Sequence, residues 1–338
     1  MSKFTNEDYL TIRQSAAIAA AANDKGMRFD SADDAAVWFM RELDDVKAKT
    51  YDRQYPELNA LRIFPVSSSV NPGAESTTFY GYDTTGTADF IANYSDDLPR
   101  ADVFGKPQTI DIRPIGASYQ YSIQDIRASR YSGKSLDARR GESARKKIDH
   151  LINRVAWCGD KEHGLRGVLS DDNNIPVWTP AAVTLPDSSI STKFTDKTPD
   201  EILKDFSDAL CYMSSLTNGV EVPDTIAIDQ ATYIYLSTTP RSPLSDTTIL
   251  KWLEVNLPGI KFERAGELQG TSEYNPFTGQ NVMVIYKNDP DKLEIEIPLM
   301  FNQLPPEARN LAFVVNCEAR IAGAIIYYPF SLLIVPGV

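Results

Sequence analysis

Few residues of this sequence have the types and the spacing that chemistry requires. The two histidines, His150 and His163, have no cysteine or carboxylate at a spacing typical of metal ligands, so we interpret them as solvated or hydrogen-bonded side chains. Residues 171–174, Asp-Asp-Asn-Asn, carry oxygen ligands, but consecutive side chains point in different directions and the EF-hand spacing is missing. The sequence therefore predicts no metal site, and it favours a solvated loop at residues 171–174.

Catalytic motifs are equally scarce. The chain has no G-x-S-x-G, Walker A or G-x-G-x-x-G motif, and the glycines of residues 159–167, GDKEHGLRG, suit a turn better than a phosphate-binding loop. Glu294 and Glu296 alternate along an expected strand and share one face, which favours a solvent-facing edge over acid/base catalysis. We predict no catalytic residue, no cofactor and no enzyme activity.

The charge balance disfavours one class of function. The chain has 338 residues, 42% of them hydrophobic, with 46 acidic and 34 basic side chains and a pI near 4.8. This length allows one large or two ordinary domains with a real core. Because the acidic excess repels nucleic acid unless positive charge is segregated, a soluble DNA-binding protein is disfavoured.

The cysteines and the two ends of the chain indicate a cytoplasmic origin. Cys158, Cys211 and Cys317 are odd in number and lie in apolar contexts, as buried thiols of a reducing compartment do. No signal peptide opens the sequence. The uncharged residues 321–338 are long enough for a C-terminal membrane anchor, but two prolines and many β-branched side chains favour a buried strand. We expect no membrane contact.

Residues 135–169 are the stretch around which we arrange the rest of the chain. Ser135 is a plausible N-cap, and apolar residues recur after it at helical spacing, which predicts a long helix with one core-facing stripe. That stripe consists of Ala144, Ile148, Leu151, Ile152 and Val155. A basic stripe follows beside it, within an arc of roughly 120°. It consists of Arg139, Arg140, Lys146, Lys147 and Arg154. Glycines at 159, 164 and 167 predict that the helix ends after Cys158 in a tight turn.

The residues before this helix have a different character. Residues 1–60 carry amphipathic helical signals at 6–22 and 31–46 and are typical of an arm, either an ordered strap on a neighbour or a loosely held extension. Residues 66–123 are polar and rich in turns. Short strand signals occur within them at 77–82, 88–91, 109–115 and 118–123. Because such a ribbon buries too little apolar surface to be stable alone, we expect it to rest on another subunit.

From residue 170 onward the sequence predicts a mixed α/β segment. Thr198, Pro199 and Glu201 have the spacing of a capping box that starts a helix, and Asn218-Gly219 ends it. Strand and helix signals then alternate at 225–228, 230–236, 247–255, 260–262, 282–286 and 293–297. Two strand-like runs, 311–318 and 324–335, close the chain. The fold class is therefore α+β.

The order of these segments, together with several sequence motifs between residues 51 and 169, resembles that of the major capsid proteins of tailed bacteriophages, which have the Hong Kong 97-type fold. These motifs are YDRQYPELNALRIFPV, SVNPGAES, YDTTGTADFIANYSDDLPRADV, YSIQDIRAS, GKSLDARR and NRVAWCGDKEHGLRGVL. By this resemblance the chain divides into an N-terminal arm, an extended β loop, a peripheral domain with a long spine helix, and an axial α/β domain. These parts are residues 1–65, 66–121, 122–166 with 311–338 (spine helix 135–158), and 167–310.

The resemblance implies a structural protein that assembles with itself into pentamers and hexamers of an icosahedral shell around double-stranded DNA. It would be made in the host cytoplasm and reside in the virion, with scaffold, portal and decoration proteins as further partners. The extended loop supplies candidate interface residues. They are Phe90, Tyr94, Asp96, Asp97, Pro99, Arg100 and Phe104. The basic stripe has two interpretations: salt bridges at subunit contacts, which we prefer, or non-specific neutralisation of packaged DNA in the lumen.

Two other classes of function stay open. One is the shell protein of a bacterial encapsulin compartment, which has the same fold and encloses a protein cargo in place of DNA. The sequence motifs of residues 51–169 favour a phage capsid protein over this alternative. A cytoplasmic α/β enzyme is disfavoured because the sequence lacks a catalytic constellation.

Overall fold

The computed structural model describes residues 57–90, 100–132, 136–242, 244 and 246–338. They belong to one compact unit, Pro56–Val338. The helices expected at 6–22 and 31–46, and the N-cap expected at Ser135, lie outside the described residues.

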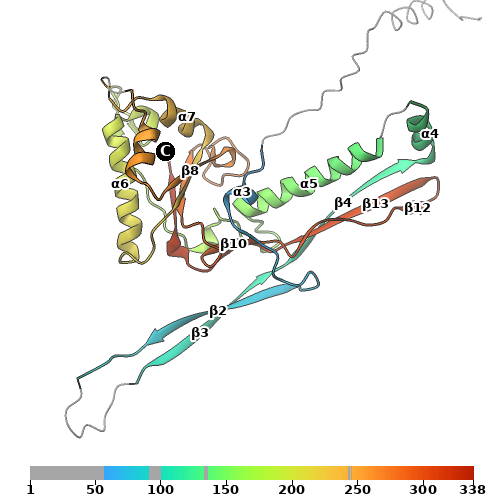
Figure 1. Ribbon diagram of the computed structural model, residues 1–338, viewed down its shortest axis with the longest axis horizontal. Coiled ribbons are helices and arrows are strands. Elements are labelled where there is room, and N and C mark those ends of the chain that lie inside the picture. Colours follow the sequence, from blue (N-terminus) through green and yellow to red (C-terminus); the bar gives the residue numbers. More distant parts are fainter. Residues whose placement is uncertain (1–56, 91–99, 133–135, 243, 245) are drawn as a thin grey trace, which may run out of the picture. The chain divides into compact units, whose positions relative to one another are not determined.

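The predicted long helix is confirmed as α5, Leu136–Cys158 (Figure 1). The predicted stripe is buried at four of its five positions, and Leu151 is the exception at 37% exposed. Leu151 lies at the edge of the stripe beside the charged face, so its burial was predicted wrongly. The last turn also buries Trp157, which the stripe did not include. It packs edge-on against Phe64, with 4.9 Å between the ring centroids.

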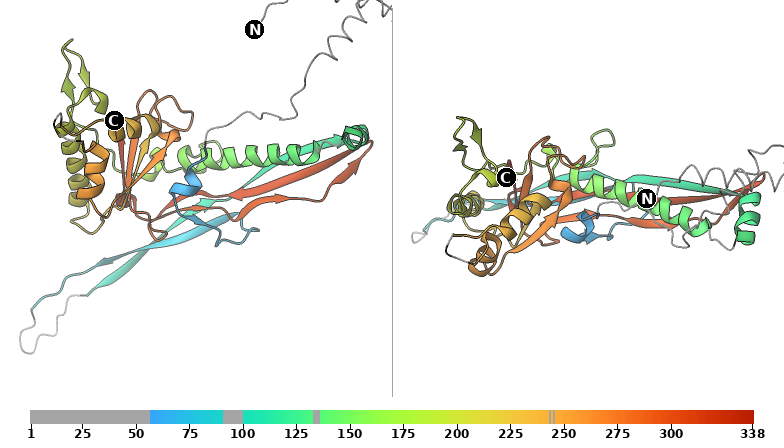
Figure 2. Two further views of the ribbon diagram at one scale, coloured as in Figure 1. Left: turned by 45° about the horizontal axis from the view of Figure 1, so that its top comes forward. Right: turned by 90° about the horizontal axis from the view of Figure 1, so that it is seen from above.

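Helix α5 lies against a four-stranded antiparallel sheet (Figure 2). Its strands are β4 (Arg113–Ser122), β13 (Ala312–Ile321), β11 (Leu299–Gln303) and β12 (Glu307–Arg309). β4 pairs with β13 along its whole length, and α4, Ile123–Ser132, follows β4 and packs on it. The strands predicted at 109–115 and 118–123 have other bounds in the structure, because β3 ends at Asp111 and β4 begins at Arg113. Between them, the Ile112 N–H donates to the Glu75 carbonyl at 2.8 Å.

Strands β2, Ser76–Thr85, and β3, Asp102–Asp111, form a two-stranded antiparallel element that we call the hairpin (Figure 1). Its register runs from Ser76 opposite Asp111 to Thr85 opposite Asp102. The strand predicted at 88–91 does not form in its described part, because residues 88–90 lie beyond the ladder. Side chains from residue 80 to the end of β2 are exposed.

The α/β segment is built around a sheet of order β15-β9-β7-β8, in which β7 and β8 are parallel. Its strands are β7 (Thr225–Asp229), β8 (Lys261–Ala265), β9 (Val282–Tyr286) and β15 (Leu332–Pro336). Its helices are α6 (Pro199–Leu216), α7 (Gln230–Thr238) and α8 (Ile249–Asn256), preceded by a short ribbon of β5 (Val183–Thr184) and β6 (Ile190–Ser191). The capping box at Thr198 and Glu201 is confirmed, and Gly219 follows α6 at φ +79°.

A third sheet has the order β1-β10-β14. Its strands are β1 (Val66–Ser67), β10 (Leu293–Glu296) and β14 (Gly323–Ile326), and α3 (Ala60–Ile63) precedes β1. Residues 57–65, which the sequence assigned to the arm, thus place α3 and Phe64 in the main core. The solvent-facing edge expected for Glu294 and Glu296 was wrong: β10 is the central strand of this sheet and Glu296 is fully buried.

The C-terminal run 324–335 is two strands rather than one. β14 and β15 belong to different sheets and are separated by a 3₁₀ turn at Pro329–Ser331, because proline cannot continue a ladder. Every residue of β15 is buried, as the strand interpretation of this apolar run predicts. In the part of the chain that the structure describes, no helix has the length and apolar character needed to cross a membrane.

The buried apolar side chains of the described residues form three clusters. The first joins α3 and α5 to the sheets, and the second lies between the helices and the sheet of the α/β segment. The third is small and lies beneath the hairpin, around Ile110, Ile112, Ala322 and Ile325. Cys317 is buried, but Cys211 is exposed on α6, contrary to the prediction of three buried thiols.

Candidate functional site

The hairpin carries apolar side chains that its own subunit does not cover. They are Tyr80, Tyr82, Val103 and Phe104 on its strands and Phe90 beyond the end of β2, each at least 60% exposed. We call them the hairpin surface. A two-stranded ribbon has no second layer beneath it, so these side chains lie in water unless another molecule covers them.

The backbone is adapted to one of these side chains. Tyr80 and Tyr82 share a face of β2, and their rings stack with 6.3 Å between centroids. Gly105 lies opposite Tyr82 in the register, and a Cβ at Gly105 would lie 2.9 Å from the Tyr82 ring. Glycine at this position therefore lets the Tyr82 ring lie across β3.

The structure describes part of the predicted interface set. Phe90, Arg100 and Phe104 are exposed on or beside the hairpin, whereas the other four candidates lie outside the described residues. Those four are Tyr94, Asp96, Asp97 and Pro99. The sequence prediction missed Tyr80, Tyr82 and Val103. The alternation of Tyr80 and Tyr82 within a turn-rich polar segment was the available signal, since one of the two faces of a ribbon must then carry both rings.

The basic stripe of α5 is divided by its contacts. Arg139, Lys146, Lys147 and Arg154 are exposed. Arg140 instead folds back on its own subunit, where its guanidinium donates to the Gln120 carbonyl at the end of β4 and to Asp125 of α4 at 3.2 Å. A hydrogen bond from the Ser122 N–H, reinforced by Arg140, holds the pKa of Asp125 below its ordinary value.

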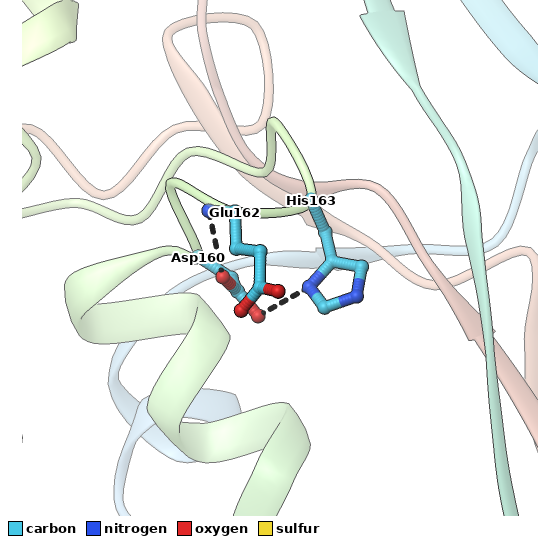
Figure 3. A group of neighbouring side chains, drawn as sticks. All are labelled: Asp160, Glu162 and His163. Atoms are coloured by element: carbon cyan, nitrogen blue, oxygen red, sulfur yellow. Dashed lines mark hydrogen bonds and ion pairs between the residues drawn. The ribbon is translucent and has the colours of Figure 1, made fainter.

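The turn after α5 gathers three potential metal ligands, which the sequence prediction excluded. His163 Nδ1 lies 2.8 Å from Asp160 Oδ2, and the Glu162 N–H donates to Asp160 Oδ1 at 3.0 Å (Figure 3). The ligand atoms of Asp160, Glu162 and His163 lie within 4.8 Å of one another. The prediction that His163 lacks a carboxylate partner was therefore wrong, because a tight turn brings residues three apart together. The hydrogen bonds of the turn account for the arrangement.

Two cavities are large enough to be considered as sites for a small molecule. One, of about 530 Å³, is lined by Asn59, Glu267 and Tyr274 among others. Glu267 accepts hydrogen bonds there from the Asn59 N–H at 2.8 Å and from Asn153 at 3.1 Å, which fix α3 to α5. The other, of about 570 Å³, lies between the end of α6 and the α8–β8 connection and has mainly apolar walls. Neither a histidine nor a cysteine lines either of these two cavities.

Comparison with known proteins identifies the family. A family model described as "Major capsid protein" matches residues 86–338. No protein with a curated description matches the chain. Among solved structures, a chain of the capsid of Myoviridae phage XM1 superposes with a TM-score of 0.74 at 14% identity, over 93% of this chain and 100% of that one.

Two further solved structures have the same fold. A capsid chain of an empty GTA particle gives a TM-score of 0.59 at 11% identity, over 88% of this chain and 95% of that one. A chain from Mycobacterium phage Ogopogo gives 0.51 at 12% identity, over 85% and 94%. The chain therefore belongs to the major capsid protein family, has the Hong Kong 97-like fold of tailed-phage capsids, and is a structural capsid subunit.

Proposed function

We propose that this subunit assembles with copies of itself into the pentamers and hexamers of an icosahedral shell that encloses double-stranded DNA. The observation that supports the proposal most directly is the hairpin surface, whose aromatic rings lie on a ribbon too thin to bury them. A neighbouring subunit beneath the hairpin would remove this apolar area from water, at roughly 25 cal/mol for each Å².

Each part of the chain has a place in this proposal. The division from the sequence assigns residues 1–65 to the arm, 66–121 to the extended loop that lies over a neighbour, and 167–310 to the axial domain. The fold narrows the first two parts, since residues 57–65 contribute to the main core and β4, Arg113–Ser122, lies in the sheet against α5. Residues 122–166 and 311–338 form the peripheral domain around spine helix 135–158, although β15 completes the axial sheet by pairing with β9. Many interfaces of this kind, each weak alone, add up to a stable closed shell.

The partners outside the shell itself follow from the same proposal. Scaffold, portal and decoration proteins would contact the assembled shell, and packaged DNA would meet its inner surface without sequence specificity. The protein would be made in the host cytoplasm and then reside in the virion.

Shortening the hairpin tests the proposal. Phe79 and Gln108 are cross-strand partners, so replacing residues 80–107 with Asn-Gly joins them through a two-residue turn and leaves the base of the hairpin intact. We expect a folded subunit that no longer forms shells, as seen by negative-stain electron microscopy beside particle mass from light scattering. An unchanged melting temperature controls for folding, and normal shells from this variant would refute the bridging role.

A further inference from the structure

The hairpin contacts its own subunit at one end. Within the ladder, the side chains that are buried or half-buried are Thr77, Phe79 and Ile110, all close to the base. Phe79 packs edge-on against Tyr327, with 4.8 Å between ring centroids, over the small third cluster. The direction in which the hairpin leaves the subunit is therefore decided by few contacts.

Small changes at the base are magnified along the hairpin. Ten residues at about 3.3 Å each carry the last pair of the ladder about 30 Å from the first, so a tilt of about 10° displaces it by about 5 Å. Such a displacement exceeds the tolerance of a packed interface, in which heavy atoms touch at about 4 Å. The subunit therefore needs a device that fixes the tilt.

The segment between β1 and β2, residues 68–75, connects the core to the hairpin, and we call it the strap. Glu296 of β10 holds it: Oε1 accepts the Val70 N–H at 3.2 Å, and Oε2 accepts the Ser69 hydroxyl at 3.5 Å. Arg320 of β13 donates to the Pro72 carbonyl of the same strap. Two strands from different sheets thus bind one short connection.

Glu296 is an unusual choice for its position. It is 0% exposed at the end of the central strand β10, between Ser67 of β1 and Gly323 of β14. Within the described part of the chain, no lysine, arginine or histidine forms an ion pair with it. A buried carboxylate that has amide and hydroxyl donors but no cation depends on those donors.

Movement of the strap would carry Val70 and Ser69 away from this carboxylate. Glu296 would stay behind in the sheet, with acceptor oxygens unpaired in a buried place, and an unpaired buried acceptor is costly. An apolar side chain at position 296 would have no directional contact with the strap. The carboxylate therefore ties the strap to one position, where an apolar residue would not distinguish among several.

We propose that Glu296 is a positioning residue that sets the direction of the hairpin by holding the strap through the Val70 N–H and the Ser69 hydroxyl. The inference rests on the proposed bridging function, because the direction matters only if the hairpin must meet a neighbouring subunit. Its test is made on unassembled subunits, so that it is independent of shell formation.

The test measures the spread of hairpin directions with a pair of spin labels. One label is placed on native Cys211, which is exposed on α6, and the other on the hairpin through Asp83→Cys, in a Cys158→Ser background. Pulsed electron spin resonance gives the distribution of distances between the labels in full-length subunits that light scattering shows to be unassembled. A second pair, Cys211 with Leu311→Cys, reports on a part of the subunit away from the hairpin.

Two variants of Glu296 distinguish hydrogen bonding from filling of space. Glu296→Met fills the site without a strong acceptor, whereas Glu296→Gln keeps one acceptor for the Val70 N–H and an amide that can donate to the Ser69 hydroxyl. We expect the hairpin distance distribution to become at least twofold broader in Glu296→Met and to stay narrow in Glu296→Gln. Glu318→Met is the matched control, since Glu318 accepts from Asn302 rather than from the strap.

Three results would overturn the inference. They are an unchanged distribution in Glu296→Met, an equal broadening in Glu296→Gln, and a broadening of the second label pair, which would indicate general loosening. Failure of the proposed function is separate, because normal shells from the shortened hairpin would refute bridging whatever the distances show.

Discussion

Gly159 and Gly167 hold the end of α5 against the chain that follows it. Gly159 has φ +71°, and a Cβ at Gly167 would lie 2.2 Å from the Gly159 nitrogen. The Ser170 hydroxyl joins both sides, accepting the Gly167 N–H at 2.9 Å and donating to the Cys158 carbonyl at 2.8 Å. Two backbone segments therefore approach more closely than any residue with a side chain at 167 permits.

Gly167→Ala should destabilise the subunit by about 3 kcal/mol, because the new Cβ meets backbone atoms that cannot move aside. Urea unfolding of the unassembled subunit measures the change. Gly259→Ala is the matched control, since no atom lies within 4 Å of a Cβ there, and it should stay within about 0.5 kcal/mol of the parent. Equal midpoints for the two variants would contradict the prediction.

Asp229 makes stability depend on pH. It caps α7 by accepting the Ala231 and Thr232 N–H groups at 3.0 Å, while its Oδ1 is buried without a partner. Burial raises the pKa of Asp229 above its ordinary value, although the capping hydrogen bonds oppose the shift. A carboxyl whose pKa is raised on folding contributes stability below its unfolded pKa and loses it as pH rises through the folded value.

Asp229→Asn should therefore gain stability relative to the parent as pH rises from about 4 to about 7, because the amide does not ionise. Urea unfolding across that range measures the difference. Asp187→Asn is the control of opposite sign and is measured below about pH 4, since hydrogen bonds from the Ser189 hydroxyl and N–H lower the pKa of Asp187, and the stability they give is lost as pH falls through that lowered pKa. Parallel pH profiles for the parent and Asp229→Asn would contradict the account.

At the scale of elements, α5 has a buried apolar side and an exposed charged side. Its buried side joins α3, β4, β13 and β14 in the first cluster. The other side keeps Lys146, Lys147 and Arg154 exposed, while Arg140 ties the helix to β4 and α4. The side chains of these three cations therefore lie on the exposed side of the helix.

Reversing the charges by Lys146→Glu with Lys147→Glu should reduce the yield of shells, if these cations meet acidic groups of neighbouring subunits. Negative-stain microscopy counts the particles, and DNA content per particle is measured beside it. Lys204→Glu with Lys251→Glu gives the same change in net charge on α6 and α8. Normal shells with less DNA would instead support the lumen interpretation.

At the scale of the whole molecule, the described part of the chain has three apolar clusters with different structural roles. The first two are large and make the core of the subunit, whereas the third is small and carries the base of the hairpin. The exposed fractions of Tyr82 and Phe104, 72% and 63%, leave apolar area for a partner. Stability and assembly thus depend on different surfaces, so variants of the hairpin surface should disturb assembly more than folding.

The elements whose signals are local could be predicted from the sequence. The capping box at Thr198, the glycine end of α5 and the strand runs at β7 and β9 all follow from periodicity and backbone preference within a few residues. The sequence motifs of residues 51–169 also indicated the family that the comparison established.

Features that depend on residues far apart in the chain could not be predicted and follow from the tertiary fold. Glu296 is buried because β1 and β14 flank it, and Arg140 leaves the basic stripe because β4 ends beside it. Leu151 is exposed because it lies at the edge of the stripe beside the charged face, whereas Ile152 at the other edge is buried. Local periodicity cannot supply these outcomes, since each depends on which distant strand the fold brings alongside.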